Sequence, residues 1–254
     1  MLLACSTPVQ ADSWYDIKGD HFIVFYKTDE PFARKTAHNA ETYYERIANE
    51  LGYARHSNFW QWEKRVKIYI YASLQEFQKD TGEPAWSHGV ARYSSKEIHT
   101  FTGSEQFMQG LLPHEIAHLI FRDFVGMEGQ IPLWLDEGVA QWQEPAKRAQ
   151  ARKYARYLIH RDKHYPIYDL TTTDVRTVKD EEKVHAFYMQ SVSLVEYLVS
   201  TYGGNAFTVF CRELRDGKKF DEALRAAYPN SIEDLGALDY KWRKYVMETP
   251  VPAS

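Results

Sequence analysis

The sequence lacks the features that define several common classes of protein. It has only two cysteines, Cys5 and Cys211, which excludes a small fold held together by several disulfides. Its apolar runs are far shorter than the roughly 20 residues of a membrane-spanning helix. Lys and Arg form no long run and the formal net charge is -4, so no nucleic-acid partner is expected. The sequence also contains no internal repeat and no low-complexity segment.

What the chain does have is material for a hydrophobic core. Its 254 residues, of which 44% are hydrophobic and 15% aromatic, suit one large domain or two tightly packed subdomains. Cys211 ends the apolar run Phe207-Thr208-Val209-Phe210-Cys211, and cysteine is among the residue types most often buried. We therefore expect a buried free thiol at this position.

The first residues resemble the lipidation signal of bacterial lipoproteins. Leu2-Leu3-Ala4-Cys5 has the form of such a lipobox, with Cys5 as the lipidated residue. The residues before Cys5 lack the basic and long apolar regions of a secretory signal, so either the start is trimmed or the match is due to chance. The first alternative predicts a protein in the cell envelope, anchored by lipid on the periplasmic side of a bacterial membrane, or secreted. Residues 1–13 would then be a tether.

Hydrophobic periodicity divides the chain into a mixed first half and a helical second half. Strands are expected at residues 21–26, 65–71, 89–93 and 97–101. Helices are expected at residues 32–51 and 73–80, and over most of residues 104–248. This order predicts an α+β fold, with an N-terminal subdomain (14–125) that combines a mixed sheet with helices, a mostly helical subdomain (126–248) and a tail (249–254).

A metal-binding pattern lies at the end of the first subdomain. His114-Glu115-Ile116-Ala117-His118 has the form HExxH on a predicted helix. Residues four apart lie one above the other on a helix, so both imidazoles can reach a single ion. Glu115 projects beside them, close enough to act as a general base on a water at the metal. A catalytic zinc wants three protein ligands and one open position, so a third ligand is needed.

Two classes of zinc peptidase supply that third ligand differently. A metzincin has Gly and then His after the second histidine, and this chain has Phe121 and Phe124 at those positions, which excludes the class. A gluzincin supplies Glu from a second helix. Glu137 lies on the next predicted helix, and Gly126, Gly129 and Pro132 provide the turn that returns the chain beside the first one.

These residues resemble a known group. His114–His118 followed by Trp134-Leu135-Asp136-Glu137-Gly138-Val139-Ala140 resembles the MA-clan gluzincins, especially bacterial peptidase-MA-like domains and the catalytic domain of the M1 aminopeptidases. The resemblance implies a zincin-like fold, zinc held by His114, His118 and Glu137, and Glu115 as base. It extends to Tyr188-Met189-Gln190-Ser191, and implies that Tyr188 stabilises the oxyanion. Either Asp136 or Gln141 is expected to orient a ligand imidazole.

The M1 exopeptidase signature, a Gly-Ala-Met-Glu-Asn strand, is missing from this sequence. The corresponding strand is expected at residues 97–101. Because this strand lacks the motif, cleavage within a chain is favoured over removal of a free N-terminal residue. If this strand lies at the sheet edge, Ile98, His99 and Thr100 can pair with an extended substrate backbone.

The favoured hypothesis is a monomeric zinc metallopeptidase that acts on extracytoplasmic proteins or peptides. A lipid on Cys5 would be its only link to a membrane. Two alternatives stay open: a zincin-like zinc-binding lipoprotein that acts as a binding or scaffold protein without turnover, and a metal-binding stress or assembly factor. An intact Glu115 and Tyr188 favour the enzyme, because a protein that only holds metal needs neither.

Overall fold

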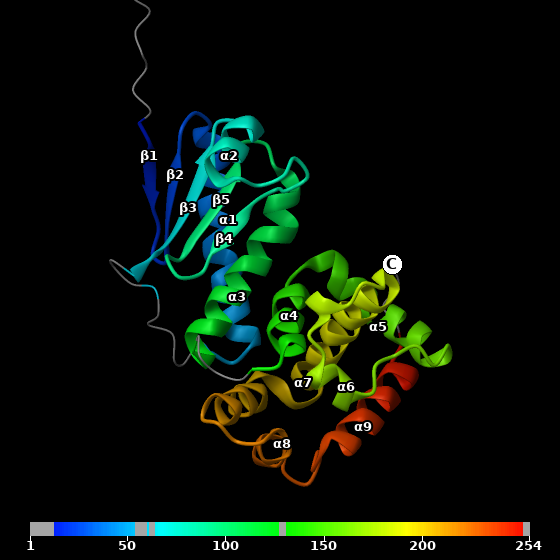
Figure 1. Ribbon diagram of the computed structural model, residues 1–254. Helices are drawn as coiled ribbons and strands as arrows, with labels where there is room; N and C mark the ends of the chain where they lie inside the picture. Colours follow the sequence, from blue (N-terminus) through cyan, green and yellow to red (C-terminus); the bar gives the residue numbers. More distant parts are fainter. Residues whose placement is uncertain (1–12, 54–59, 61–63, 127–130, 251–254) are drawn as a thin grey trace, which may run out of the picture.

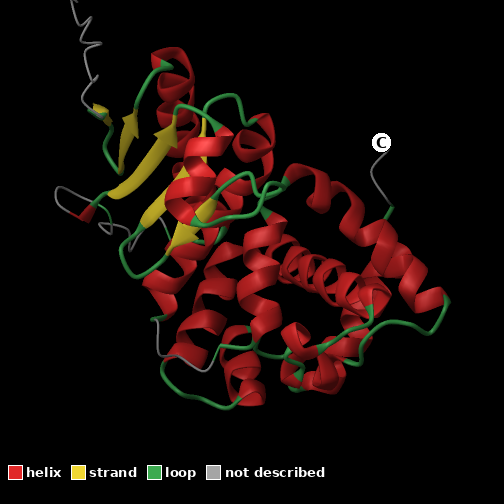
Figure 2. Ribbon diagram, turned by 45° about the horizontal axis from the view of Figure 1, so that its top comes forward, coloured by secondary structure: helices red, strands yellow, loops and turns green. Residues whose placement is uncertain are grey.

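A five-stranded mixed sheet forms one end of the molecule. The computed structural model describes residues 13–53, 60, 64–126 and 131–250. The strand order is β1-β2-β3-β5-β4, in which β2, β3 and β5 run parallel and β1 and β4 are antiparallel outer strands. The strands are β1 (Tyr15–Lys18), β2 (Phe22–Tyr26), β3 (Val66–Tyr71), β4 (Val90–Arg92) and β5 (Glu97–Phe101). Figure 2 shows these strands gathered at one end of a largely helical molecule.

Helices form the rest of the described structure. They are α1 (Glu30–Glu50), α2 (Leu74–Thr81), α3 (Leu112–Val125), α4 (Leu133–Trp142), α5 (Pro145–His160), α6 (Ile167–Thr172), α7 (Glu181–Arg215), α8 (Phe220–Ala227) and α9 (Leu235–Glu248). A π-helical turn (Phe107–Leu111) leads into α3, and a 3-10 turn (Val175–Thr177) precedes α7. None of the described helices is both long and apolar enough to cross a membrane.

The sheet has two different faces because side chains alternate along each strand. Val24, Ile68 and Ile98 pair side by side across β2, β3 and β5 and are fully buried. They belong to the core that includes the apolar residues of α1 and α3. On the opposite face, Phe25 and Tyr69 stack with ring centroids 5.0 Å apart, in the next register position. The buried face of the sheet therefore packs against α1, which in turn contacts α3, the helix with the HExxH pattern.

Local sequence signals fix the start of α1 and of α3. Asp29 caps α1 by accepting a 2.9 Å hydrogen bond from the backbone N–H of Phe32, and a proline occupies the first turn. Pro113 likewise lies in the first turn of α3. α3 follows the π-helical turn directly, and such turns are frequent at functional sites. Most of α3 is buried, so its position is set by packing on several sides.

A close contact between α1 and α7 joins the sheet to the helical part. α7 is broken at Gly203, whose φ of 83° and ψ of 157° are not helical. The next residue, Gly204, packs so tightly that an added Cβ would lie 2.5 Å from the carbonyl oxygen of Glu50 and 2.8 Å from the nitrogen of Gly52. Thr208 adds a 2.7 Å hydrogen bond to the carbonyl of Leu51. Glycine is required here because two backbones meet.

The predicted α+β class is confirmed, and one core cluster extends from β2 to α9 through both parts of the chain. Cys211 is a fully buried free thiol, as expected. Burial raises its pKa to about 12. β1 was not predicted, because only its half-buried Ile17 faces the core. Cys5 and the predicted tether up to residue 12 lie outside the described residues, and the boundary after residue 125 stays a prediction.

Candidate metal centre

The three predicted ligands meet between α3 and α4, which pack against each other. One ligand atom from each of His114, His118 and Glu137 lies within 4.8 Å of the others. The two imidazoles come from successive turns of α3, with ring centroids 4.7 Å apart. Nε2 of His118 lies 3.9 Å from Oε1 of Glu137. The structure thus brings together the residues that the spacing had selected.

Each imidazole is oriented by its own carboxylate. Nδ1 of His114 lies 2.8 Å from Oε1 of Glu144, and Nδ1 of His118 lies 2.8 Å from Oδ1 of Asp136. A carboxylate accepts hydrogen bonds only, so each Nδ1–H donates and each Nε2 keeps its lone pair for a ligand bond. Carboxylates that fix the tautomer in this way are the usual partners of metal-binding histidines. Two imidazoles and one carboxylate fit zinc, whose catalytic sites have three protein ligands and one open position.

Asp136 links His118 to a cation. Its carboxylate accepts a 2.7 Å hydrogen bond from Nη2 of Arg122, which lies one turn after His118 on α3. Burial alone would raise the pKa of Asp136, but the hydrogen bonds and charges of His118 and Arg122 outweigh burial and lower this pKa to about 2. Asp136 therefore stays negative near neutral pH. Burial lowers the pKa of His118, but the hydrogen bond and the charge of Asp136 outweigh burial and raise this pKa.

Glu137 is held from its own helix and by the approach of α7. Nε2 of Gln141, one turn later, donates a 3.3 Å hydrogen bond to Oε2 of Glu137, while Oε1 faces His118. The neighbouring Gly138 lies against α7, where an added Cβ would meet the carbonyl oxygen of Ser191 at 2.8 Å. Gly138 therefore lets α4 approach α7 closely enough to fix the position of Glu137.

Glu115 is almost fully buried, with 7% of its surface exposed. Its Oε2 accepts a 2.7 Å hydrogen bond from the hydroxyl of Tyr93, which lies in the turn between β4 and β5. The guanidinium of Arg122 lies 4.0 Å from the centroid of the Tyr93 ring. Burial, followed by the charge and hydrogen bond of Glu115, raises the pKa of Tyr93 far above its usual range. Tyr93 is therefore a permanent hydrogen-bond donor to Glu115.

Tyr188 is half-buried on α7 and packs edge-on against Phe187. Burial raises the pKa of its hydroxyl, and the negative charge of Glu137 adds to the effect. Tyr188 also lines a cavity of about 270 Å³ together with Gln141, whose amide holds Glu137. These relationships place Tyr188 on the Glu137 side of the cluster. Its role at the oxyanion stays a prediction.

The pairing of residues 97–101 with a substrate was expected on the condition that this strand lies at the sheet edge, and the structure does not meet that condition. β5 lies between β3 and β4, and β4 is the outer strand on that side. Ile98 and Thr100 are fully buried, and His99 is 4% exposed. His99 stacks on Tyr69 at 5.0 Å, on the sheet face opposite Ile98. β4 therefore occupies the side of β5 on which an extended substrate would have had to pair.

Glu144 and Tyr93 were not found from the sequence. Glu137, Gln141 and Glu144 are spaced i, i+4 and i+7, which places them on one face of α4 and its extension. This spacing is a signal that could have identified Glu144. Asp136 and Gln141 were the two candidates for orienting a ligand histidine. In the structure Asp136 is hydrogen-bonded to His118, and Gln141 is hydrogen-bonded to Glu137. Tyr93 had no such signal, because its contact with Glu115 arises only from the packing of the sheet on α3.

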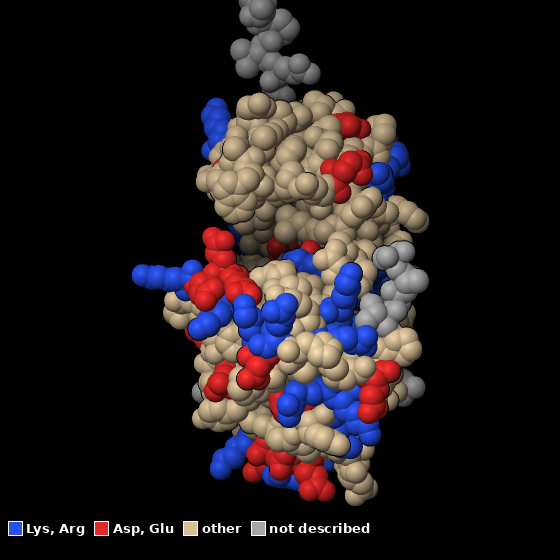
Figure 3. Space-filling model, turned by 90° about the vertical axis from the view of Figure 1, so that its right-hand side faces the viewer, with Lys and Arg blue, Asp and Glu red and all other residues tan. Residues whose placement is uncertain are grey.

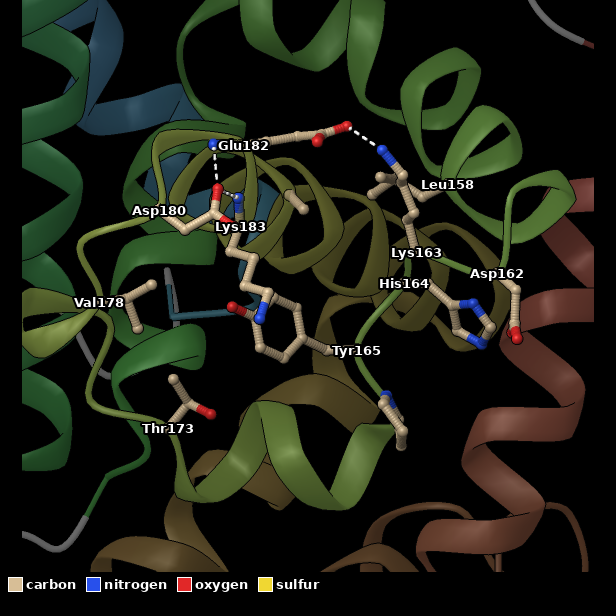
Figure 4. A pocket seen from close by; sticks show the side chains of 12 residues that line it. Leu158, Asp162, Lys163, His164, Tyr165, Thr173, Val178, Asp180, Glu182 and Lys183 are labelled. Atoms are coloured by element: carbon tan, nitrogen blue, oxygen red, sulfur yellow. Dashed lines mark hydrogen bonds and ion pairs between the residues drawn. The ribbon is translucent and has the colours of Figure 1, made fainter.

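A separate cavity of about 640 Å³ lies among α5, the following loop, and the start of α7 (Figure 4). Charged side chains in its wall form an ion pair with each other and hydrogen bonds to the first turn of α7. Lys163 pairs with Glu182 at 2.7 Å, and Asp180 caps α7 by accepting from the backbone N–H of Glu182 and of Lys183. Its described lining thus comes from α5 to α7, whereas the metal-ligand candidates come from α3 and α4.

Comparison with known proteins identifies the family. The sequence profile of the Peptidase MA superfamily matches residues 54–248, which is most of the chain. The chain therefore belongs to the Peptidase MA superfamily. This membership bears out the resemblance to gluzincin-like domains, and with the His, His, Glu cluster it supports a metallopeptidase in the general sense.

Solved structures give two further similarities. An M1 zinc metallopeptidase from Deinococcus radiodurans and a mutant of the same enzyme each match 94% of this chain, with 15% identity and a TM-score of 0.49. The match covers 52% and 53% of those chains, so this chain spans about half their length. The search of curated proteins gives no match.

Proposed function

We propose that the protein is a zinc-dependent metallopeptidase that hydrolyses peptide bonds within protein or peptide chains. The observation that carries the proposal is the cluster of His114, His118 and Glu137, in which each imidazole is already oriented by a carboxylate. Three such ligands with an open side are the donor set of a catalytic zinc, whereas structural zinc sites are closed by four protein ligands. Membership of the Peptidase MA superfamily supports the same reading.

The residues around the cluster have distinct tasks in this proposal. Zinc bound there supplies a Lewis acid that polarises the scissile carbonyl and lowers the pKa of the attacking water towards ~7. Glu115 accepts the proton of that water and passes it to the leaving amine. Because Tyr93 occupies Oε2 of Glu115, we assign the proton transfer to Oε1. Tyr188 donates a hydrogen bond to the developing oxyanion, and one such donor is worth roughly 3–4 kcal/mol.

Substrates outside the cytoplasm are part of the proposal, and this part rests on sequence alone. The lipobox-like Leu2–Cys5 lies outside the described residues. We propose a monomer whose only attachment to a membrane is a lipid on Cys5. Mass spectrometry of the protein purified from its natural source tests this directly. A diacylglyceryl-modified Cys5 supports it, and an unmodified Cys5 in a protein that retains the residue overturns it.

The metal assignment is tested by zinc content. We expect wild type to bind close to one zinc per chain, and His114→Ala and Glu137→Ala to lose it, because each removes a ligand. His38→Ala is the matched control, since His38 is exposed on α1. Elemental analysis after dialysis gives the stoichiometry. Zinc retained equally by all four proteins would show that the cluster is not the site.

Turnover is tested with a library of peptides blocked at both ends. Wild type should cleave internal bonds, and Glu115→Gln should lose cleavage by about a hundredfold or more while it keeps zinc, because general-base catalysis contributes typically 10²–10⁴-fold. Zinc binding without cleavage by wild type would favour the scaffold alternative. Equal cleavage by both proteins would show that Glu115 is not the base.

A further inference from the structure

A cavity of about 610 Å³ opens directly beside the candidate metal centre, on the side of His114. Glu144 belongs to both, because it lines the cavity and its Oε1 holds Nδ1 of His114 at 2.8 Å. Figure 3 shows the molecule hollowed between the sheet part and the helical part, with charged side chains at the bottom of the hollow. A ligand in this cavity is thus separated from the metal ligands by a single side chain.

The cavity also lies at the start of the outer strand. Its wall includes Gly89, which immediately precedes β4 (Val90–Arg92), the outer strand of the sheet on this side. An added Cβ at Gly89 would lie 2.8 Å from Cδ2 of Leu111, so glycine allows the loop before β4 to rest on the wall of the cavity. An extended chain laid along β4 towards the metal centre therefore passes the cavity.

The wall of the cavity is mainly apolar. Trp86 is 79% exposed and is the most exposed large hydrophobic side chain of the described residues. Leu111, Pro145 and Tyr43 line other parts of the wall. An open indole face is a costly surface for a protein to leave in water, and it packs well against another ring. Covering these surfaces with a large apolar side chain would remove the most apolar area from water.

Charge in the wall points the same way. The carboxylate of Glu144 is hydrogen-bonded to His114 and paired with Lys147 at 2.8 Å, so its charge is offset before any ligand arrives. Moving a carboxylate from water onto this mainly apolar wall would cost free energy, so an acidic side chain would be disfavoured. The volume lies within the range of ordinary ligand pockets and exceeds that of one aromatic side chain.

We propose that this cavity is a substrate subsite that takes a large apolar side chain, aromatic by preference, of an extended peptide, with Trp86 as its specificity-determining residue. This inference rests on the proposed peptidase function. It selects the substrates of that function: peptides with an aromatic residue at one fixed position relative to the cleaved bond.

The test measures binding and needs no turnover. The probes are fluorescein-labelled, C-amidated hexapeptides of alanine in which one position in turn carries Phe, Lys or Glu. Fluorescence anisotropy with zinc-loaded Glu115→Gln protein should find one position at which Phe strengthens binding about tenfold over Ala, while Glu weakens it. Adding Trp86→Ala should abolish the advantage of Phe. Adding Tyr168→Ala, which removes another exposed aromatic side chain, on α6, should leave it intact.

The possible results test the subsite and the peptidase function independently of each other. A Phe advantage that survives Trp86→Ala, a preference for Lys, or equal binding of all peptides would overturn the subsite. If wild type does not cleave any peptide but Glu115→Gln shows the Trp86-dependent preference, hydrolysis fails and the cavity stands as a binding site for an aromatic side chain of a peptide. If wild type cleaves without any aromatic preference, the peptidase stands and the subsite fails.

Discussion

The hydroxyl of Tyr93 donates a 2.7 Å hydrogen bond to Oε2 of Glu115 and so joins the β4–β5 turn to the candidate general base. The Tyr93 ring lies beneath the guanidinium of Arg122, which binds Asp136, which in turn holds His118. One continuous series of contacts therefore runs from the sheet to a metal ligand. The contacts hold both Glu115 and the imidazole of His118 in position.

Removing the Tyr93 hydroxyl should slow catalysis more than it weakens binding. Tyr93→Phe keeps the ring under Arg122 but frees Oε2 of Glu115, so the base is less well oriented. A hydrogen bond to a charged group contributes about 1.5–3 kcal/mol. We therefore expect kcat to fall about tenfold or more, with KM and zinc content nearly unchanged, as measured by steady-state kinetics and elemental analysis.

The control for Tyr93→Phe is Tyr168→Phe, which removes a hydroxyl from an exposed tyrosine on α6. It should leave kcat unchanged. A Tyr93→Phe enzyme with wild-type kcat would show that the contact with Glu115 has no part in positioning the base. A parallel loss of zinc would show instead that the contact holds the metal centre together.

Glu144 should contribute to metal affinity although it is not a ligand. Glu144→Ala leaves Nδ1 of His114 without its carboxylate, so the ring can turn and its Nε2 becomes a weaker donor. Losing such a partner typically costs 10–100-fold in metal affinity. Competition against a chromogenic chelator measures it. Glu105→Ala, which removes an exposed carboxylate paired with Lys35, should leave affinity unchanged, and an equal affinity in both variants would contradict the prediction.

A methyl group at Gly138 should destabilise the protein and disturb the third ligand. In Gly138→Ala the new Cβ would lie 2.8 Å from the carbonyl oxygen of Ser191, so α4 must move away from α7 and carry Glu137 with it. Overpacking of this kind costs about 1–3 kcal/mol. Urea unfolding and zinc titration should both respond. In the control Gly110→Ala the added Cβ meets no atom within 4 Å. Equal stability of the two variants would show that α4 tolerates the shift.

The stabilising contribution of Glu41 should be lost in acid. Burial alone would raise its pKa, but hydrogen bonds from the side chain and backbone of His21 outweigh burial and leave this pKa below the usual 4.5. A lowered pKa in the folded state contributes stability that is complete above the unfolded pKa and is lost as pH falls through the folded one. Stability should therefore decline as pH falls below 4.5 and through the lower pKa of the folded state.

Glu41→Gln should weaken that decline, because the amide does not titrate. Urea unfolding at a series of pH values gives the free energy of unfolding and its slope. Glu45→Gln, on the exposed face of the same helix, is the control and should keep the wild-type slope. The same slope in all three proteins would show that Glu41 does not account for the acid sensitivity.

Periodicity predicted the elements whose signal is local. β2, β3, α1 and α2 lie where alternating or helical spacing placed them, because each buries one face. The order of strands was less accessible. Nothing in Glu97–Phe101 or Val90–Arg92 indicates which strand is outer, since the pairing of β5 with β3 joins residues far apart in the chain. For this reason the sequence left open whether Glu97–Phe101 is an edge strand that a substrate could join.

The metal centre was predictable to the extent that it is built from helix geometry. His114 and His118 follow from the period of the helix, and Glu137 from its position on the next helix. The partners Glu144 and Tyr93 depend on how α4, α5 and the sheet pack around α3. Tertiary contacts of this kind leave at most a weak trace in spacing, so the catalytic surroundings emerged only from the structure.

The ligands and the side chains that orient them all lie within residues 114–144. Bringing such neighbouring segments together costs little chain entropy, so an ion can bind once α3 and α4 have paired. Binding to the folded form alone adds stability by mass action, about 2.7 kcal/mol when free ion exceeds its dissociation constant a hundredfold. In the proposed zinc enzyme, residues 114–144 would therefore resist unfolding more strongly as the zinc concentration of their surroundings rises.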